Sequence, residues 1–276
     1  MKRILYPECA SGISGDMAVG ALLDLGASEE KLREILHTIP LAEPCEIRIS
    51  RVKKAGLDTC DFDVVLPEEI DPHDHDMEYL HGRKNMVKEK DSVHEGHTHT
   101  HGHRGPGEIR ELYQASAMSE GAKAVADRIL TILAEAEAKV HDVPVSKVHF
   151  HEVGAVDSVI DIAAFAICFD EVCHLHGIDE VIVTGLTEGR GTVRCQHGIL
   201  PVPVPAVTQI VTKHRLPLRL TQIEGELVTP TGAAIAAAIA TGCELPEECR
   251  ILSCGLGAGK RAYETAGFLR MMLLEV

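Results

Sequence analysis

The periodic spacing of apolar residues that marks helices and strands is lost between residues 67 and 106. This stretch is crowded with Asp, His, Glu, Lys, Gly and Pro and holds few aliphatic side chains. Such a segment cannot bury enough apolar surface to fold, so we expect a disordered loop there. The flanking residues 1–66 and 107–276 must then fold together. We predict that they form one α/β core domain, with two subdomains as an alternative division.

Helical and extended patterns alternate along both flanking segments. The predicted strands lie at about residues 3–6, 47–49, 60–66, 178–184, 248–252 and 268–276. The predicted helices lie at about residues 17–25, from 28 onward, 119–140, 157–174, 206–213 and from 229 onward. Two of the strands alternate apolar and polar residues around Ala55 and Gly56, which indicates a hairpin. This order favours a layered helix–sheet domain of the α/β or α+β class, interrupted by the His-rich insertion.

Charge and cysteine usage exclude several classes of partner. The chain has 42 acidic against 27 basic residues and a formal net charge of −15, so we expect no nucleic-acid and no membrane partner. It contains no apolar run long enough to span a bilayer, and its N-terminus lacks the apolar segment of a signal peptide. Nine cysteines without a Cys-x-x-Cys pair fit free thiols in a reducing compartment. We therefore expect a cytoplasmic protein.

The His-rich segment is the first candidate site. Eight of the sixteen histidines fall between His73 and His103. Neutral imidazole is a ligand for Ni, Cu, Zn and Co, and the affinity order alone does not choose among them. A solvated linker without a metal role is the alternative interpretation. We predict a loop that captures or delivers metal through His94, His97, His99, His101 and His103.

A second cluster of ionisable groups follows in residues 148–161. If the chain is extended there, His149 and His151 project from one face, and Glu152 follows as a ligand or base. Asp157 and Asp161 are four residues apart on the predicted helix, so they lie on the same helical face. We predict that His149, His151, Glu152 and Asp157 are catalytic, and that the two histidines also bind metal. The alternative is that Asp157 merely caps the helix and the histidines are surface residues.

Three glycine-rich turns are candidate anion sites, because free backbone N–H groups at a helix start can hold phosphate. Tight turning without a ligand is the alternative for each. None matches the Walker pattern, which weakens a nucleoside triphosphatase interpretation. The residues predicted to bind a nucleotide or cofactor are Ser11, Gly12, Ser14, Gly15 and Asp16 in the first turn, Thr229, Thr231 and Gly232 in the second, and Lys260 in the third.

Cys195 and His197 lie two residues apart before a proline-rich segment. They could serve as soft and borderline metal ligands, or simply as core and turn residues. The second interpretation is favoured, because free cysteine is usually buried and inert. No Gly-x-Ser-x-Gly motif is present, so a serine hydrolase has no anchor.

Taken together, these motifs resemble the LarC family, the nickel insertion proteins of nickel-pincer cofactor synthesis. The resemblance spans nearly the whole chain, and several of the matching motifs are long. The matching stretches are CASGISGDM at 9–17, GALLD at 20–24, HFHEVGAVDS at 149–158, GRGTV at 189–193, HGILPVP at 197–203 and ELVTPTG at 226–232.

The resemblance implies a CTP-dependent cyclometallation. Nickel would enter pyridinium-3,5-bisthiocarboxylic acid mononucleotide with two Ni–S bonds and one Ni–C bond, while CTP is cleaved to CMP and pyrophosphate. The His-rich loop would then collect Ni(II), and the glycine turns would hold the mononucleotide phosphate. His149, His151 and Glu152 would be handover ligands, or the base that takes the ring C4 proton.

The family's C-terminal domain is the main departure. The resemblance assigns CTP binding, with Mg or Mn, to a C-terminal domain that this chain lacks, so the partner domain would act in trans or within a longer chain. The oligomeric state stays open, a homo-oligomer included. Two other functions compete: a nickel store or metallochaperone built on the His-rich loop, and a phosphohydrolase with two metals near Asp157 and Asp161.

Overall fold

The computed structural model describes residues 1–67, 104–150, 155–195 and 197–276. Its largest sheet has six strands in the order β2-β3-β9-β10-β1-β4. β1 lies between β10, to which it is antiparallel, and β4, to which it is parallel. The strand bounds are Arg3–Glu8 (β1), Glu46–Lys54 (β2), Leu57–Val65 (β3), Glu180–Val181 (β4), Arg250–Ala258 (β9) and Phe268–Glu275 (β10).

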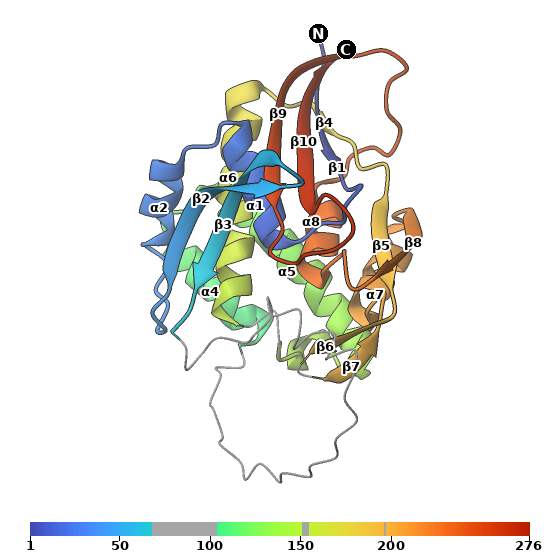
Figure 1. Cartoon of the computed structure of the whole chain (residues 1–276). Helices are drawn as coiled ribbons and strands as arrows, with labels where there is room; N and C mark the ends of the chain where they lie inside the picture. The colour runs from blue at the N-terminus through green and yellow to red at the C-terminus, as the bar shows by residue number, and fades with distance from the viewer. Residues whose placement is uncertain (68–103, 151–154, 196) are drawn as a thin grey trace.

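Helices cover one face of this sheet (Figure 1). α1 packs directly on β3, β9 and β10, α6 packs behind α1, and α5 packs against α6, α7 and α8. The layered α/β architecture predicted from the sequence is therefore confirmed. The helix bounds are Gly15–Leu25 (α1), Glu29–Leu36 (α2), Pro106–Ala115 (α4), Glu120–His141 (α5), Val156–His176 (α6), Pro205–His214 (α7) and Pro230–Ile239 (α8), with a short 3₁₀ turn at Val145–Lys147.

Two strand pairs extend the fold beyond the main sheet. β5 (Leu186–Arg190) and β8 (Leu218–Glu224) are parallel, whereas β6 (Thr192–Cys195) and β7 (Gly198–Pro201) form a tight antiparallel hairpin. In Figure 1 the β6–β7 hairpin lies at the lower end of the molecule, below α8. The sequence did not predict these pairs, because such short strands carry too few residues for a period-two pattern to stand out.

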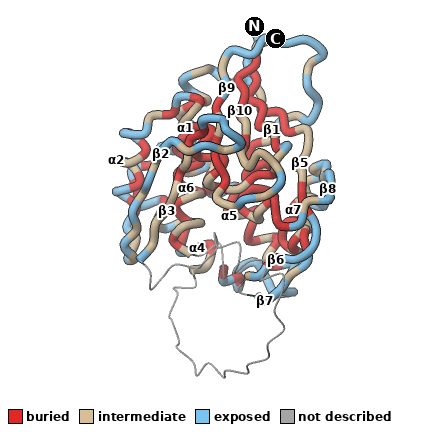
Figure 2. Tube along the Cα trace, in the orientation of Figure 1, coloured by how far each residue is buried: buried red, intermediate tan, exposed pale blue. Residues whose placement is uncertain are grey.

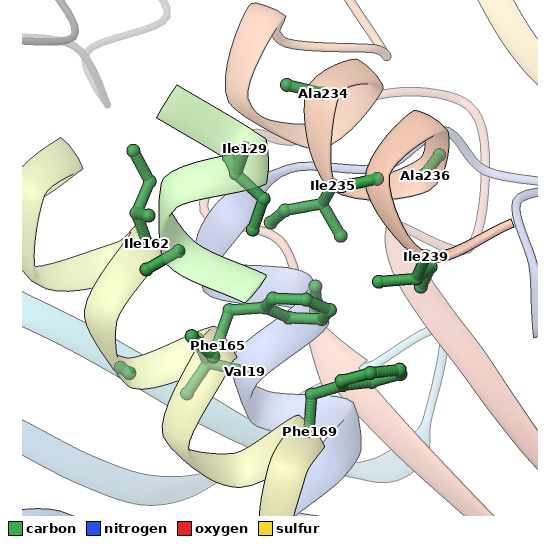
Figure 3. Close-up of a cluster of buried hydrophobic side chains, with 14 of the residues drawn as sticks. Val19, Ile129, Ile162, Phe165, Phe169, Ala234, Ile235, Ala236 and Ile239 are labelled. Atoms are coloured by element: carbon green, nitrogen blue, oxygen red, sulfur yellow. The ribbon is translucent and has the colours of Figure 1, made fainter. Parts of the chain in front are cut away.

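The hydrophobic core lies between the sheet and the helices and among the helices themselves. Figure 2 shows burial concentrated along α1, α5, α6 and β10, with β2 and β8 more exposed. Phe165 and Phe169 stack with ring centroids 5.6 Å apart, and Figure 3 shows Ile129, Ile235 and Ile239 around them. α6 is buried around most of its circumference, which explains why its sequence is apolar on nearly every side.

The predicted helix boundaries follow from local capping chemistry. The hydroxyl groups of Ser28, Ser119 and Thr229 accept hydrogen bonds from backbone N–H groups three residues ahead, at 3.2, 3.0 and 3.1 Å. Gly26 ends α1 with φ 121°, a conformation that favours glycine. The β2–β3 hairpin turns through Ala55 and Gly56, both with positive φ. These predictions are confirmed.

The structure differs from the prediction in three places. The strand expected at 178–184 contains only Glu180–Val181, at the edge of the sheet. α4 was not predicted; its two buried anchors, Ile109 and Tyr113, leave little periodic signal. The third glycine-rich turn, which precedes Lys260, includes residues that belong to β9, Gly257 among them. A Cβ at Gly257 would lie 1.9 Å from the Met17 carbonyl oxygen. Glycine is therefore needed there for close helix–strand packing.

No helix in the described ranges combines the length and apolar character that crossing a membrane requires. The histidines at 94–103 lie outside the described residues.

Candidate functional site

A cavity of about 250 Å³ opens where the helix starts meet the β6–β7 hairpin. Two groups of residues line its walls, the loop end and the hairpin end. The loop end comprises Ser11, Ser14, Gly15, Asp16, Met17, Thr229, Pro230, Thr231, Gly259, Lys260 and Arg261. The hairpin end comprises Glu137, His141, Cys195 and His197. The first two turns of α6 contribute Asp157, Ser158 and Asp161.

The start of α1 presents backbone N–H groups to the cavity. Ser14 is the N-cap residue, yet it makes no side-chain capping bond, and its hydroxyl instead donates to Asp16. The first backbone bond of the helix runs from Ala18 N to Ser14 O, at 3.1 Å. The N–H groups before Ala18 therefore lack intrahelical partners, which is the arrangement that binds anions at helix starts.

Gly12 and Gly232 hold the loop end together and do not line the cavity. A Cβ at Gly12 would lie 2.0 Å from the Leu227 carbonyl oxygen, and one at Gly232 would lie 2.1 Å from the Ile13 carbonyl oxygen. Ile13 N donates to Leu227 O at 3.0 Å, and Thr229 N donates to Ile13 O at 3.1 Å. These two predicted ligand-binding glycines therefore serve the tight-turn alternative, since they permit two backbones to touch.

Both cations of the loop end are paired with carboxylates. Lys260 Nζ lies 2.6 Å from Asp61 Oδ1 and 3.2 Å from Asp63 Oδ1, and Arg261 lies 2.6 Å from Glu226 Oε2. Burial lowers the pKa of Lys260, but the hydrogen bond and charge of Asp61 outweigh that effect and raise it overall. Lys260 therefore stays protonated at any physiological pH, as a fixed positive charge beside the cavity.

Asp161 has a perturbed carboxyl group in the cavity wall. Burial raises its pKa well above the usual range, and the nearby charges of Asp16 and Asp157 raise it further. A Cβ at Gly15 would lie 2.5 Å from Asp161 Oδ2, so glycine at that position lets the carboxyl group approach the α1 backbone. The raised pKa favours the protonated form of Asp161, which can donate a hydrogen bond.

Asp157 lines the cavity in the first turn of α6. The N-cap of that helix is Ala155, which has no side chain for capping, so Asp157 is not the cap residue that the alternative interpretation assumed. An acidic group in the first turn still interacts favourably with the helix dipole.

His149 lies away from the cavity. Val148 and Phe150 are 4% and 1% exposed, whereas His149 between them is exposed and does not line the cavity. The predicted alternation is therefore present, with the apolar neighbours facing the core. His151 and Glu152 lie outside the described residues, so their predicted roles stay predictions.

The hairpin end contains residues that the sequence analysis undervalued or missed. His141, in the last turn of α5, has its ring centroid 5.1 Å from that of His197. His141 Nε2 lies 3.3 Å from Glu137 Oε2, one helical turn earlier. Cys195 ends β6, paired with Gly198, and His197 lies in the turn; both border the cavity. His197 is therefore the turn residue that the favoured interpretation expected, whereas the half-buried Cys195 is not a core residue. Nothing in the local sequence distinguishes His141 from a histidine that suits a helix C-terminus.

Glu188 is a further residue that the sequence analysis missed. It is 0% exposed, and its Oε1 accepts hydrogen bonds from the backbone N–H groups of Gly189, Leu227 and Val228 at 2.8, 2.7 and 3.2 Å. Burial raises its pKa to about 7, although the three hydrogen bonds oppose that change. Glu188 thereby fixes the strand that leads into Thr229 and the loop end.

Within the described part of the chain, no three His, Cys, Asp or Glu side chains converge closely enough to hold a metal ion by themselves. A resident metal centre made only of described side chains is therefore not seen. Any metal in this cavity would need at least one ligand from another source.

Comparisons with known proteins agree with the motifs. The family model described as "Nickel insertion protein" matches residues 5–276. A protein of Alkaliphilus metalliredigens named pyridinium-3,5-bisthiocarboxylic acid mononucleotide nickel insertion protein is 48% identical over 100% of this chain and 61% of its own length. A protein of the same name from Akkermansia muciniphila is 38% identical, also over 100% of this chain and 61% of its own length.

A Geobacter protein named putative nickel insertion protein is 38% identical over 99% of this chain and 62% of its own length. This chain thus spans about three fifths of the curated relatives it matches. No solved structure matches it. Because the family model covers nearly every residue and the identity extends from end to end, the chain belongs to the nickel insertion protein family.

Proposed function

We propose that this chain performs nickel insertion into pyridinium-3,5-bisthiocarboxylic acid mononucleotide, as a nickel chelatase and cyclometallase of the lyase class. The observation that supports the proposal most directly is the cavity itself. It joins two helix starts, a half-buried lysine and an aspartate with a raised pKa at one end to imidazole and thiol groups at the other. A substrate with a phosphate and two thiocarboxylates needs both kinds of partner.

The loop end suits the phosphate of the mononucleotide. The N–H groups at the start of α1 and the Lys260 ammonium group supply donors and positive charge. The carboxylates nearby would repel a dianion, and the raised pKa of Asp161 reduces the contribution of that group to the repulsion. The protonated form of Asp161 would donate a hydrogen bond to a phosphate oxygen rather than oppose it.

The insertion step forms two Ni–S bonds and one Ni–C bond, and the proton on ring C4 must pass to a base. We retain His149, His151, Glu152 and Asp157 as candidates for that base or for nickel handover. Of these, Asp157 borders the cavity. Nickel is the cargo of the reaction, and we propose that His94, His97, His99, His101 and His103 collect it.

We also propose that the reaction depends on CTP, cleaved to CMP and pyrophosphate, with Mg or Mn bound alongside. The relatives are longer than this chain, which covers 61% of the Alkaliphilus protein. The remaining portion of such a relative is a reasonable source of a CTP-binding domain, supplied in trans or within a longer chain.

The test is nickel-dependent turnover followed by the absorbance of the pincer product. The chain is assayed alone and with the C-terminal region of the Alkaliphilus relative, and nickel, CTP and Mg are omitted one at a time. We expect product only when all components are present. A His149→Ala/His151→Ala double variant should lose turnover, whereas His174→Ala, which alters an exposed histidine at the far end of α6, should not.

Other outcomes would identify the competing functions. Product without CTP would remove the nucleotide requirement. Nickel bound by the histidines at 94–103 with no product under any condition would favour a store or metallochaperone. Phosphate release without any thiocarboxylate substrate would favour a phosphohydrolase.

A further inference from the structure

We propose that the hairpin end is the nickel transfer site, where His141 and His197 bind Ni(II) together with the sulfur atoms of the substrate, while Cys195 lines the same cavity. This inference rests on the proposed function and adds to it the protein ligands at the moment of insertion. It concerns residues other than the predicted cluster at 149–152.

Two imidazole rings lie close together at the hairpin end. The His141 and His197 rings come from α5 and from the β6–β7 turn, yet their centroids are 5.1 Å apart with a 33° angle between planes. Figure 1 shows the hairpin beside the lower end of α5. Side chains from two distant segments thus meet at one wall of the cavity. Both rings are partly open to solvent, so a metal can reach them.

A neighbouring carboxylate can orient the His141 imidazole. His141 Nε2 lies 3.3 Å from Glu137 Oε2. A carboxylate behind a ligating imidazole fixes its ring and tautomer and strengthens it as a ligand. With Nε2 directed to Glu137, Nδ1 is the nitrogen of His141 that would coordinate nickel. Glu137 is mostly buried, with 16% of its side chain exposed, which favours a fixed position.

The donor atoms at the hairpin end are of types that suit Ni(II). Thiolate is a soft ligand and imidazole a borderline one, and Ni(II) with nitrogen and sulfur donors favours a square-planar arrangement. Cys195 is half-buried at the end of β6, where it pairs with Gly198, and borders the same cavity. Its sulfur is a donor of the same soft class as the substrate sulfurs. The loop end, in contrast, offers oxygen and N–H groups, which suit a phosphate better than nickel.

The substrate would supply the remaining ligands. Two imidazoles and two thiocarboxylate sulfurs together make the four donors of a square-planar Ni(II) site. The hairpin end should therefore bind nickel more tightly when the mononucleotide is present.

The test is nickel affinity with and without the mononucleotide, measured by competition with a chromogenic chelator. To remove background, the parent protein is the full chain with His94, His97, His99, His101 and His103 changed to Asn. Sulfur-to-nickel charge-transfer absorption reports on coordination independently of turnover. Circular dichroism checks that each variant is folded.

We expect His141→Ala and His197→Ala to weaken nickel binding in the presence of the mononucleotide by about 100-fold, and Glu137→Gln by about 10-fold, the range seen when a residue behind a metal ligand is lost. Affinity for the mononucleotide without nickel should stay within about twofold, because the loop end is unchanged. The matched control, His174→Ala, should behave as the parent.

Two results would overturn the proposal in distinguishable ways. If the parent binds nickel and mononucleotide together and both histidine variants do so equally well, the transfer site is wrong while the proposed function stands. If the parent shows no nickel-dependent binding of the mononucleotide and no product, both the transfer site and the proposed function fail.

Discussion

The loop end of the cavity is held by backbone contacts, whereas the hairpin end presents its chemistry on side chains. At the loop end, Ile13 N bonds Leu227 O and Thr229 N bonds Ile13 O, at 3.0 and 3.1 Å. At the hairpin end, a helix terminus and a two-stranded ribbon bring His141 and His197 together. A preorganised backbone suits a constant group such as phosphate, while exposed side chains can adjust as a metal changes ligands.

Gly12→Ala should break the loop end and produce the largest loss of stability. Gly12 has φ +88°, and an added Cβ would lie 2.0 Å from the Leu227 carbonyl oxygen. Left-handed strain and overpacking together predict a loss of about 4 kcal/mol, measured by urea unfolding. Gly56→Ala is the control, because its φ is +80° with no atom within 4 Å of the added Cβ. Equal losses in the two variants would contradict the packing argument.

Glu188→Gln should flatten the pH dependence of stability. Because folding raises the pKa of Glu188 from 4.5 to about 7, the folded state binds more protons between these values. The free energy of unfolding therefore falls as pH rises through this window, by on the order of 3 kcal/mol. Urea unfolding at pH 4, 5, 6 and 8 should show that fall in the parent and a smaller one in the variant.

Glu224→Gln serves as the control for this experiment, because the Glu224 side chain is 69% exposed. Removing its charge should leave the pH dependence of the free energy of unfolding unchanged. A parent-like slope in Glu188→Gln would mean that another buried group, such as Asp161, is responsible for the pH dependence.

Lys260→Gln should weaken mononucleotide binding without nickel by about tenfold, or about 1.4 kcal/mol, because it removes a charge beside the proposed phosphate position. Isothermal titration calorimetry measures the change. Lys213→Gln removes a lysine that pairs with Glu135 on the surface and should leave the affinity as in the parent. If both variants bound equally well, the phosphate would not lie at the loop end.

His197→Ala and Cys195→Ser should have the smallest effect on stability, within about 0.5 kcal/mol, because surface substitutions rarely cost more. Thermal unfolding checks this. The difference between the two ends of the cavity is clearest if these variants keep their stability but lose nickel binding, while Gly12→Ala loses stability. A large destabilisation would show that the hairpin end is structural.

The sequence predicted most of the elements on which the site is built. Ser28, Ser119 and Thr229 cap helices through hydrogen bonds three residues ahead, and such bonds depend on neighbouring residues alone. The turns around Ser11 and Thr229 were predicted to be candidate sites for the same reason. Gly257 was misassigned to a turn, because its need for glycine arises from Met17, a residue 240 positions away in the chain.

What the sequence by itself determined is the local structure, the α/β class and the motifs of the nickel insertion family, since caps, turns and apolar periodicity act over a few residues. Only the tertiary structure decided that His141 meets His197. It also decided that Asp161 lies near other acids, which raises the pKa of Asp161. It decided, too, that Gly12 packs against the Leu227 backbone while Ser14 lines the cavity. Each of these depends on contacts between distant segments, which burial and packing create and no local pattern encodes.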